Sequence, residues 1–267
     1  MCDTCGCPSP SDNHSHDHNH DHGHSHSHNH NHDHSHDHGH SKTVSVHASL
    51  FAANDALARA NREHFNEVGA VALNLISSPG SGKTTLLEHT IEALKGEIRI
   101  GVIEGDIETE RDAERIRAKG VPVIQLTTGG ACHLDAAMTH KGFHRLQKEP
   151  GGEKIDLLFI ENVGNLVCPS TFDLGEHERV VLVSVPEGPD KPAKYPKAFT
   201  SSHTFVVTKT DLLPYFDFPV PAAVGDALSL NPKLRTMDLS SKTGEGMESW
   251  LNYLRELVGR MKAGTLK

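Results

Sequence analysis

Seven short apolar runs alternate with helical stretches along most of the chain, and this pattern limits the fold more than any other feature. The runs span residues 70–76, 98–103, 121–126, 155–160, 180–185, 204–207 and 236–239. They read as continuously apolar, which is typical of strands that helices cover on both faces. The pattern therefore predicts an α/β fold with a doubly wound, mostly parallel sheet.

The first 41 residues are excluded from that sheet by their composition. After Met1 they contain no aliphatic residue and no Phe, Tyr or Trp, so they have too little apolar surface to offset chain entropy. We expect residues 1–7 to form a cysteine-rich head, residues 8–41 a disordered histidine-rich tract, and residues 44–267 one domain. That domain is predicted to open with an amphipathic helix that ends near Val68.

Charge and hydropathy narrow the possible partners. The net charge is −9, and residues 1–41 hold six aspartates and no lysine or arginine, so the domain carries only −3. This mild acidity argues against a nucleic-acid partner or a polybasic membrane surface. The chain also lacks an apolar run of about 18 to 20 residues and the basic and apolar regions of a signal peptide. We therefore expect a cytoplasmic protein with no membrane association.

A glycine-rich loop, Ser-Ser-Pro-Gly-Ser-Gly-Lys-Thr-Thr at positions 77–85, follows the first apolar run and precedes a helical stretch. Such a loop turns backbone N–H groups toward phosphate oxygens at a helix N-terminus. Lys83 is expected to neutralise the β- and γ-phosphates, and the Thr84 hydroxyl to ligate Mg²⁺. A structural turn is the alternative. The residues expected to contact nucleotide here are Gly80, Ser81, Gly82, Lys83, Thr84 and Thr85.

The segment after residues 204–207 indicates which base is bound. A carboxylate at Asp211 can accept hydrogen bonds from guanine N1–H and N2–H, whereas adenine offers no such donor pair. Lys209 is expected to lie along the base, and Ser241 and Lys242 to belong to a loop that closes over it. Thr208 stands where the motif of this type begins with asparagine. A solvated loop is the alternative to guanine recognition.

Two other strand ends carry acidic residues, at positions where open parallel sheets build their sites. Asp106 is the candidate for a Mg²⁺ contact, and Glu161 could hold a metal-bound water. Gly164 could give its backbone N–H to the γ-phosphate, as a segment that senses hydrolysis must. Helix caps or turns are the alternative roles. The predicted catalytic residues are thus Lys83, Thr84, Asp106 and Glu161.

Cys132, His133 and Cys168 form a second candidate metal site, this one within the domain. Thiolate and imidazole together suit Zn²⁺, Ni²⁺ or copper better than Mg²⁺. We expect the adjacent Cys132 and His133 side chains to diverge, so that a second subunit of a homodimer would complete the coordination. Two buried, metal-free cysteines are the alternative.

The N-terminal segment offers further ligands. Cys2, Cys5 and Cys7 are close enough in sequence to wrap one ion, which we expect to be Ni²⁺. Behind them, fourteen imidazoles on a flexible chain provide many weak sites and hence capacity; an expression tag is the alternative origin. These histidines are His14, His16, His18, His20, His22, His24, His26, His28, His30, His32, His34, His36, His38 and His40.

Taken together, the cysteine head, the histidine tract and the motifs at 78–85, 104–106, 129–133 and 161–169 resemble the hydrogenase nickel-incorporation accessory GTPases, the HypB type. The resemblance covers essentially the whole chain. It implies a slow, Mg²⁺-dependent GTPase of the signal-recognition and nitrogenase-iron-protein-like class, which dimerises with nucleotide.

The resemblance also implies binding of GTP or GDP, Ni²⁺ and Zn²⁺, and a metal site of Cys132, His133 and Cys168 near the dimer interface. The implied partners are a HypA-type zinc-binding protein and the precursor of the [NiFe]-hydrogenase large subunit. Two alternatives stay open: a sister GTPase that serves urease, and a protein whose main role is to store nickel.

Overall fold

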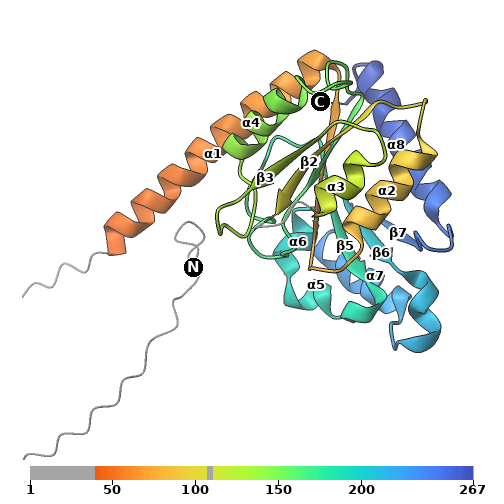
Figure 1. The fold of residues 1–267 in the computed structure, drawn as a ribbon. Helices are drawn as coiled ribbons and strands as arrows, with labels where there is room; N and C mark the ends of the chain where they lie inside the picture. Colours follow the sequence, from red (N-terminus) through yellow and green to blue (C-terminus); the bar gives the residue numbers. More distant parts are fainter. Residues whose placement is uncertain (1–39, 107–110, 267) are drawn as a thin grey trace, which may run out of the picture.

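The computed structural model describes residues 40–106 and 111–266, and their seven strands form one parallel sheet (Figure 1). The strand order is β3-β2-β4-β1-β5-β6-β7. The doubly wound, parallel α/β fold predicted from the apolar runs is confirmed. The strands are β1 (Val71–Ser77), β2 (Ile100–Asp106), β3 (Val123–Thr127), β4 (Leu157–Glu161), β5 (Glu178–Ser184), β6 (Thr204–Thr208) and β7 (Arg235–Leu239).

Helices cover both faces of the sheet and connect successive strands, except that a segment without a helix joins β4 to β5 (Figure 1). One face packs against α2, α3 and α8. The other packs against α1 and α4 and, farther along, against α6 and α7. The α-helices are α1 (His40–Val68), α2 (Lys83–Ala93), α3 (Arg111–Arg117), α4 (Ala136–Leu146), α5 (Lys191–Lys194), α6 (Pro196–Thr200), α7 (Val220–Leu230) and α8 (Met247–Lys262), and two 3₁₀ helices span Val185–Glu187 and Thr210–Tyr215.

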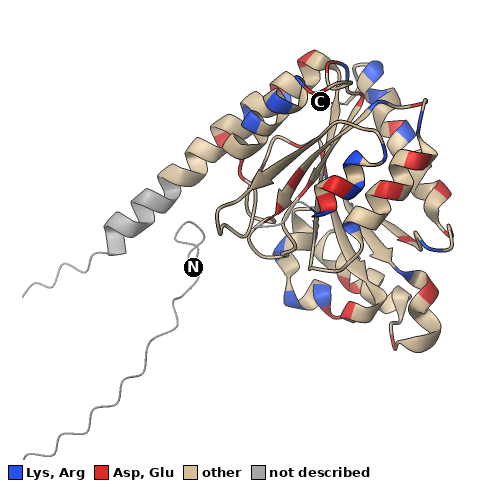
Figure 2. Cartoon of the chain, in the orientation of Figure 1, with Lys and Arg blue, Asp and Glu red and all other residues tan. Residues whose placement is uncertain are grey.

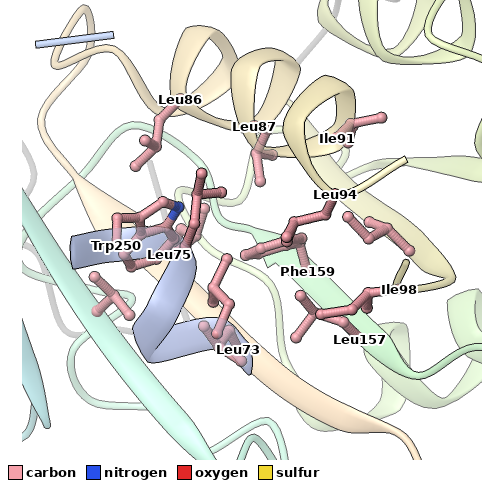
Figure 3. Packing of buried hydrophobic residues seen from close by; sticks show 14 of the residues in the cluster. Leu73, Leu75, Leu86, Leu87, Ile91, Leu94, Ile98, Leu157, Phe159 and Trp250 are labelled. Carbon is pink, nitrogen blue, oxygen red and sulfur yellow. The ribbon is translucent and has the colours of Figure 1, made fainter. Parts of the chain in front are cut away.

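The central strand β1 shows why the apolar runs do not alternate. Every residue of β1 is buried, and successive side chains point to opposite faces. Leu73 and Leu75 pack with Leu86 of α2 and Trp250 of α8, as Figure 3 shows. Ala72 and Ile76 pack in the clusters on the second face, where Asn74 instead donates a hydrogen bond to Glu176, so most positions on both faces are apolar.

The second face is covered in two parts. Phe65 of α1 and Phe143 of α4 pack edge to face, with ring centroids 4.9 Å apart, over the half of the sheet that holds β2 and β4. Phe199 of α6 packs against Phe205 of β6 over the other half, with centroids 5.1 Å apart. These aromatic contacts fix α1 and α4 beside the loops that follow β3 and β4.

The first helix begins at His40, about one turn before the predicted position near Val44, and ends at Val68 as expected. Nothing in residues 40–43 stops a helix, since the nearest glycine is Gly39. The expectations for Cys2, Cys5, Cys7 and the histidines from His14 to His38 lie outside the described residues. In the described part, no helix is long and apolar enough to cross a membrane. Acidic and basic side chains are interspersed over the helices in the view of Figure 2.

An ion pair at the base of the sheet generates a stability prediction. Asp156, just before β4, accepts hydrogen bonds from the backbone N–H of Arg99 at 3.0 Å and from its guanidinium at 2.7 and 2.8 Å. These bonds, the side-chain ones first, lower the pKa of Asp156 to about 2. Because the folded pKa lies below the unfolded one, the stabilisation is complete above about pH 4 and is lost as the pH falls toward 2.

Replacing Asp156→Asn should therefore lower the free energy of unfolding by about 1 to 2 kcal/mol at pH 7. The difference from wild type should shrink to about half by pH 3. Urea denaturation at several pH values measures both effects. Asp190→Asn, which removes an exposed pair with Lys194, serves as the control and should leave stability unchanged. A pH-independent difference for Asp156→Asn would contradict this account.

Candidate nucleotide and metal sites

The glycine-rich loop lies at the carboxyl end of β1 and leads directly into α2. In the sheet order β1 stands between β4 and β5, whereas the chain continues to β2, which lies beyond β4. This crossover is the kind of position where open α/β sheets bind ligands. Gly80 and Gly82 have φ angles of 74° and 96°, a left-handed backbone that glycine adopts without strain. The loop can thus direct its N–H groups toward an anion at the start of α2.

Ser77 occupies the position where this type of loop usually begins with glycine. Its side chain is fully buried, and its Oγ accepts hydrogen bonds from the Lys83 ammonium at 2.9 Å and from the Ser81 hydroxyl. The Ser77 hydroxyl in turn donates to the Ser78 carbonyl at 2.8 Å. Ser77 therefore holds Lys83 against the loop, a role that the sequence pattern did not reveal.

A cavity of about 480 Å³ opens in front of the loop and brings together most of the predicted catalytic and phosphate-binding residues. Lys83, Thr84, Asp106, Glu161 and Gly164 all line it. The structure adds wall residues that the sequence analysis did not select. These are Glu104, Asp112 and Arg115, together with Pro79, Asn162 and Val163.

Two buried carboxylates face this cavity from neighbouring strands. Glu104 of β2 pairs in register with Glu161 of β4, and each residue is less than 5% exposed. Glu161 Oε1 accepts a hydrogen bond from the Thr84 hydroxyl at 2.9 Å. The Oε2 atoms of Glu104 and Glu161 have no hydrogen-bond partner within the described residues.

The protonation of this pair reflects its surroundings. Burial and then the charge of Glu161 raise the pKa of Glu104 to about 9, while burial raises the pKa of Glu161 to about 6 despite the nearby Lys83. A protein does not keep two like charges buried side by side without a compensating cation. The donor set of carboxylates and a hydroxyl matches the oxygen ligands that Mg²⁺ prefers. The residues present therefore fit a divalent ion at this point.

Arg115 of α3 also reaches the cavity wall. Its guanidinium is paired with Glu88 at 2.6 Å and with Asp112 at 2.9 Å, and one nitrogen lies 3.4 Å from the Thr85 hydroxyl. Two carboxylates thus hold the guanidinium at the entrance to the cavity. Arg115 lies on a helix face that carries no recognisable motif, so its position in the sequence does not indicate this role.

A second cavity of about 270 Å³ adjoins the first and shares Gly82, Thr85 and Lys209 with it. Asp211, Ser241 and Lys242, the residues predicted to contact the base, all line this cavity. Asp211 Oδ1 accepts a hydrogen bond from the Ser240 hydroxyl at 2.7 Å, and the Lys242 ammonium lies 3.8 Å from Oδ2. The carboxylate is thereby fixed at the wall of a pocket, as recognition of a base requires.

Thr208 replaces the usual asparagine of this motif and still joins the two loops. Its hydroxyl donates to the Ser81 carbonyl at 2.6 Å, and the Lys209 ammonium donates to the Gly80 carbonyl at 2.6 Å. Lys209 has a φ of 59°, the only positive value among the described residues other than glycine. The contact between base loop and phosphate loop is therefore retained.

The third group of predicted residues also converges. The ligand atoms of Cys132, His133 and Cys168 all lie within 4.8 Å of one another. The expectation that Cys132 and His133 diverge is wrong: Cys132 Sγ lies 3.9 Å from His133 Nδ1. The two residues lie in a loop between β3 and α4 rather than in a regular element, so neighbouring side chains can turn the same way.

The surroundings of His133 favour metal binding. His133 stacks on Phe172 with ring centroids 4.0 Å apart, and burial lowers the pKa of His133, which favours the neutral, metal-binding form.

Short contacts connect this cysteine and histidine cluster to the phosphate cavity. Asn162, next to Glu161, accepts a hydrogen bond from the backbone N–H of Leu134, the residue after His133, at 3.1 Å. Asn165 forms an isolated bridge with Ser77. One segment, residues 161–168, therefore contacts the phosphate loop at one end and carries Cys168 at the other.

Comparison with known proteins agrees with this geometry. Residues 71–237 match the family model described as the CobW/HypB/UreG nucleotide-binding domain. The fold and the phosphate loop thus define a P-loop nucleotide-binding protein of that class.

More specific similarity comes from two hydrogenase maturation factors HypB. The one from Rhizobium leguminosarum bv. viciae is 48% identical over 219 residues, which cover 82% of this chain and 72% of that protein. The one from Escherichia coli K12 is 47% identical, with 80% and 72% covered. The crystal structure of HypB from Helicobacter pylori in complex with nickel has a TM-score of 0.75 and 41% identity, and the match covers 80% of this chain and 98% of that one. The chain belongs to the HypB family of hydrogenase maturation factors.

The contact between Gly164 and the phosphate loop generates a second prediction. A Cβ atom at Gly164 would lie 3.0 Å from Pro79 Cα and 3.1 Å from Pro79 Cγ. Gly164→Ala should displace the loop by a few tenths of an ångström and weaken nucleotide binding about tenfold. Titration with a fluorescent guanine nucleotide measures the loss. Gly225→Ala, at a helical position with open space around it, should bind as tightly as wild type; equal affinity in both variants would show that the contact is unimportant.

Proposed function

We propose that this protein hydrolyses GTP and uses the nucleotide cycle to deliver nickel to a hydrogenase precursor. The observation that carries the proposal is the segment of residues 161–168, which contacts the phosphate loop and holds Cys168 in a cluster of metal-ligating atoms. The HypB relatives named as hydrogenase maturation factors, and the one crystallised with nickel, support it.

The chemistry assigned to the cavity is positioning and charge neutralisation of a phosphoryl group. In the proposed complex Lys83 leaves Ser77 Oγ to contact the β- and γ-phosphates, and loop N–H groups surround the phosphate oxygens. Mg²⁺, held by Thr84, Asp106 and the Glu104 and Glu161 carboxylates directly or through water, would neutralise developing charge. Arg115 adds a second cation at the entrance. The slow turnover expected from the sequence stays a prediction.

Guanine selectivity rests on Asp211. Its carboxylate can accept both guanine N1–H and N2–H while the Ser240 hydroxyl donates to Oδ1. Lys209 supplies a hydrocarbon stem for the base to lie on, and Ser241 and Lys242 also line the pocket. GTP and GDP are the proposed nucleotides.

Cys132, His133 and Cys168 are assigned to a transferable metal ion, Ni²⁺ as cargo or Zn²⁺. Three ligands from one chain leave a coordination position for water, a client or a second copy of the chain. A homodimer that depends on nucleotide or metal is therefore part of the proposal. Cys2, Cys5 and Cys7 are proposed as a separate Ni²⁺ site in the head, and the histidine tract of residues 8–41 as a nickel reserve, both attached to the GTPase domain of residues 44–267.

A HypA-type zinc protein and the [NiFe]-hydrogenase large-subunit precursor are the proposed partners, and the cytoplasm is the proposed location. Nickel storage is a second candidate function, favoured by the fourteen alternating histidines. Two Helicobacter pylori relatives are named hydrogenase/urease maturation factors, but nothing favours urease over hydrogenase as the client here. Deleting residues 8–41 separates the roles, because loss of maturation at ample nickel indicates delivery and loss only at scarce or excess nickel indicates storage.

The hydrolysis itself has a direct test. Lys83→Ala should reduce GTP turnover by about a hundredfold or more, because the cation nearest the transferred phosphate is lost. Phosphate release measures the rate, and maturation of hydrogenase in cells should fall with it. Lys95→Ala removes an exposed lysine beyond the same helix and should match wild type. Unchanged turnover in Lys83→Ala would refute the assignment.

Base selectivity has its own test. Asp211→Asn presents one donor and one acceptor in place of two acceptors, which complements the N1–H and C2 carbonyl of xanthine. The variant should lose preference for GTP by about tenfold to a hundredfold and gain turnover of xanthosine triphosphate. Asp217→Asn, an exposed change nearby, should keep the preference for GTP. Equal hydrolysis of ATP and GTP by wild type would contradict guanine recognition.

Coupling between nucleotide and metal should be measurable in a chain without residues 8–41 and with Cys2, Cys5 and Cys7 replaced. Ni²⁺ affinity is compared with GDP and with a non-hydrolysable GTP analogue bound. A difference of about 5- to 150-fold is expected, and metal must change the nucleotide affinities in the same ratio. Cys132→Ala with Cys168→Ala should abolish this binding. Equal affinities in the two nucleotide states would exclude a switch.

A further inference from the structure

Three histidines gather on the facing surfaces of α1 and α4, and none of them lines the two nucleotide cavities or belongs to the cysteine cluster. His140 and His144 stand one turn apart on α4, and their Nε2 atoms are 3.2 Å apart. His64 of α1 faces them, with its ring centroid 4.9 Å from that of His144 and 6.5 Å from that of His140. The two helices lie side by side (Figure 1).

Hydrogen bonds fix which nitrogen of His140 is free. Asn61, almost fully buried, donates its two amide N–H groups to the carbonyls of Ala136 at 2.8 Å and Leu174 at 2.9 Å. Its Oδ1 can then only accept, so His140 Nδ1, 2.9 Å away, must carry the proton and donate. The lone pair of neutral His140 is therefore on Nε2, the atom that faces His144. Metal-ligating histidines are commonly oriented by such a bond from their other nitrogen.

The spacing also matches the geometry of a metal ion. Two imidazole nitrogens at about 2.0 to 2.1 Å from one ion are about 2.9 Å apart at a right angle and about 3.4 Å apart at the tetrahedral angle. The observed 3.2 Å lies between these limits. The ring centroids of adjacent ligands should be about 4.5 to 5.2 Å apart. The His140–His144 pair at 4.5 Å and the His64–His144 pair at 4.9 Å satisfy this condition. The His64–His140 pair, at 6.5 Å, exceeds it, so the His64 ring must turn toward His140 to complete the site.

We propose that His140 and His144, with His64 closing from the opposite helix, form a binding site for a borderline divalent ion such as Ni²⁺ or Zn²⁺. Imidazole is a good ligand for both ions. The bound ion joins α1 to α4, and α1 is the helix that continues from the histidine tract into the domain.

The surroundings keep these ligands available. Burial and the neighbouring imidazoles lower the pKa of His64 and of His140, so both are neutral near pH 7. The carboxylate of Glu67 acts on His64 in the opposite direction and supplies a negative charge beside the site. His144 is exposed, so an ion can reach the pair from solvent. The remaining positions on the ion are open to water.

Local hydrogen exchange in the full chain tests this site, and comparison with its variants separates it from the nearby ligands Cys132 and His133, which precede α4. Backbone exchange is followed by mass spectrometry with Ni²⁺ alone and with Zn²⁺ alone, in peptides from residues 58–68 and 138–146. An ion that joins the two helices should slow exchange in both peptides by about tenfold or more in at least one of the two arms. His144→Gln, an exposed change that the fold should tolerate, and the double variant with His140→Gln should abolish the effect.

His89→Gln is the matched control, because His89 is an exposed histidine on α2, on the opposite face of the sheet. It should retain the slowed exchange. GTP turnover should be the same in all these variants, which separates this site from the GTPase proposal. His64→Gln should weaken the slowing of exchange by the ion, and the loss should be larger in the peptide from α1 than in the peptide from α4. If neither ion slows exchange in wild type, or if the double variant keeps the protection, the histidines form only a hydrogen-bonded pair and the proposal is wrong.

Discussion

The parallel pairing of β4 between β1 and β2 is the constraint on which the site depends. Because the three strands run in the same direction and in register, their carboxyl ends meet at one edge of the sheet. The phosphate loop leaves β1 there, Glu104 lies near the end of β2, and Glu161 ends β4. A one-residue slip of one strand would turn each of its side chains to the other face of the sheet and separate the residues of the site. The close packing of these side chains against α2 and α8 on one face and against α1 and α4 on the other opposes that slip.

The same pairing places two buried carboxyl groups side by side at the carboxyl edge of the sheet. Among the residues that the structure describes, none bonds to the buried Oε2 atoms of Glu104 and Glu161, and Lys83 donates to Ser77. A nucleotide with its cation would supply positive charge to the carboxylates and phosphate to Lys83 at once. The site is therefore built for a pair of opposite charges rather than for either alone, since one without the other leaves a buried charge uncompensated. Burial raises the pKa of Glu104 because a buried negative charge without a cation is unfavourable, and a bound cation would reverse that shift.

Sequence reasoning predicted the fold and the loop residues because those depend on local pattern: apolar runs, glycine spacing and residues at strand ends. It could not predict contacts that only the folded chain creates. Ser77 stands where such a loop usually has glycine, and only the folded structure shows that its hydroxyl orients Lys83. Arg115 belongs to an ordinary charged helix until α3 packs beside the cavity. The convergence of Cys132 and His133 was predicted wrongly, because rules for adjacent side chains in helices and strands do not apply to an irregular loop.

The proposed path of nickel has a thermodynamic order. Isolated imidazoles bind borderline ions weakly, whereas a site of two thiolates and a buried imidazole binds them firmly, so transfer from the tract to Cys132, His133 and Cys168 is downhill. Release from that site to a client is then uphill unless something weakens it. The segment of residues 161–168 can couple nucleotide binding to metal affinity, because it contacts the phosphate loop through Gly164 and Asn165 and ends at Cys168. A coupling of about 1 to 3 kcal/mol would lower the metal affinity by about 5- to 150-fold in one nucleotide state. That change reverses the direction of transfer only if the client binds nickel nearly as tightly as the site of Cys132, His133 and Cys168 does. Nucleotide hydrolysis would then determine when nickel is released, and the affinity of the client would determine how much of it is transferred.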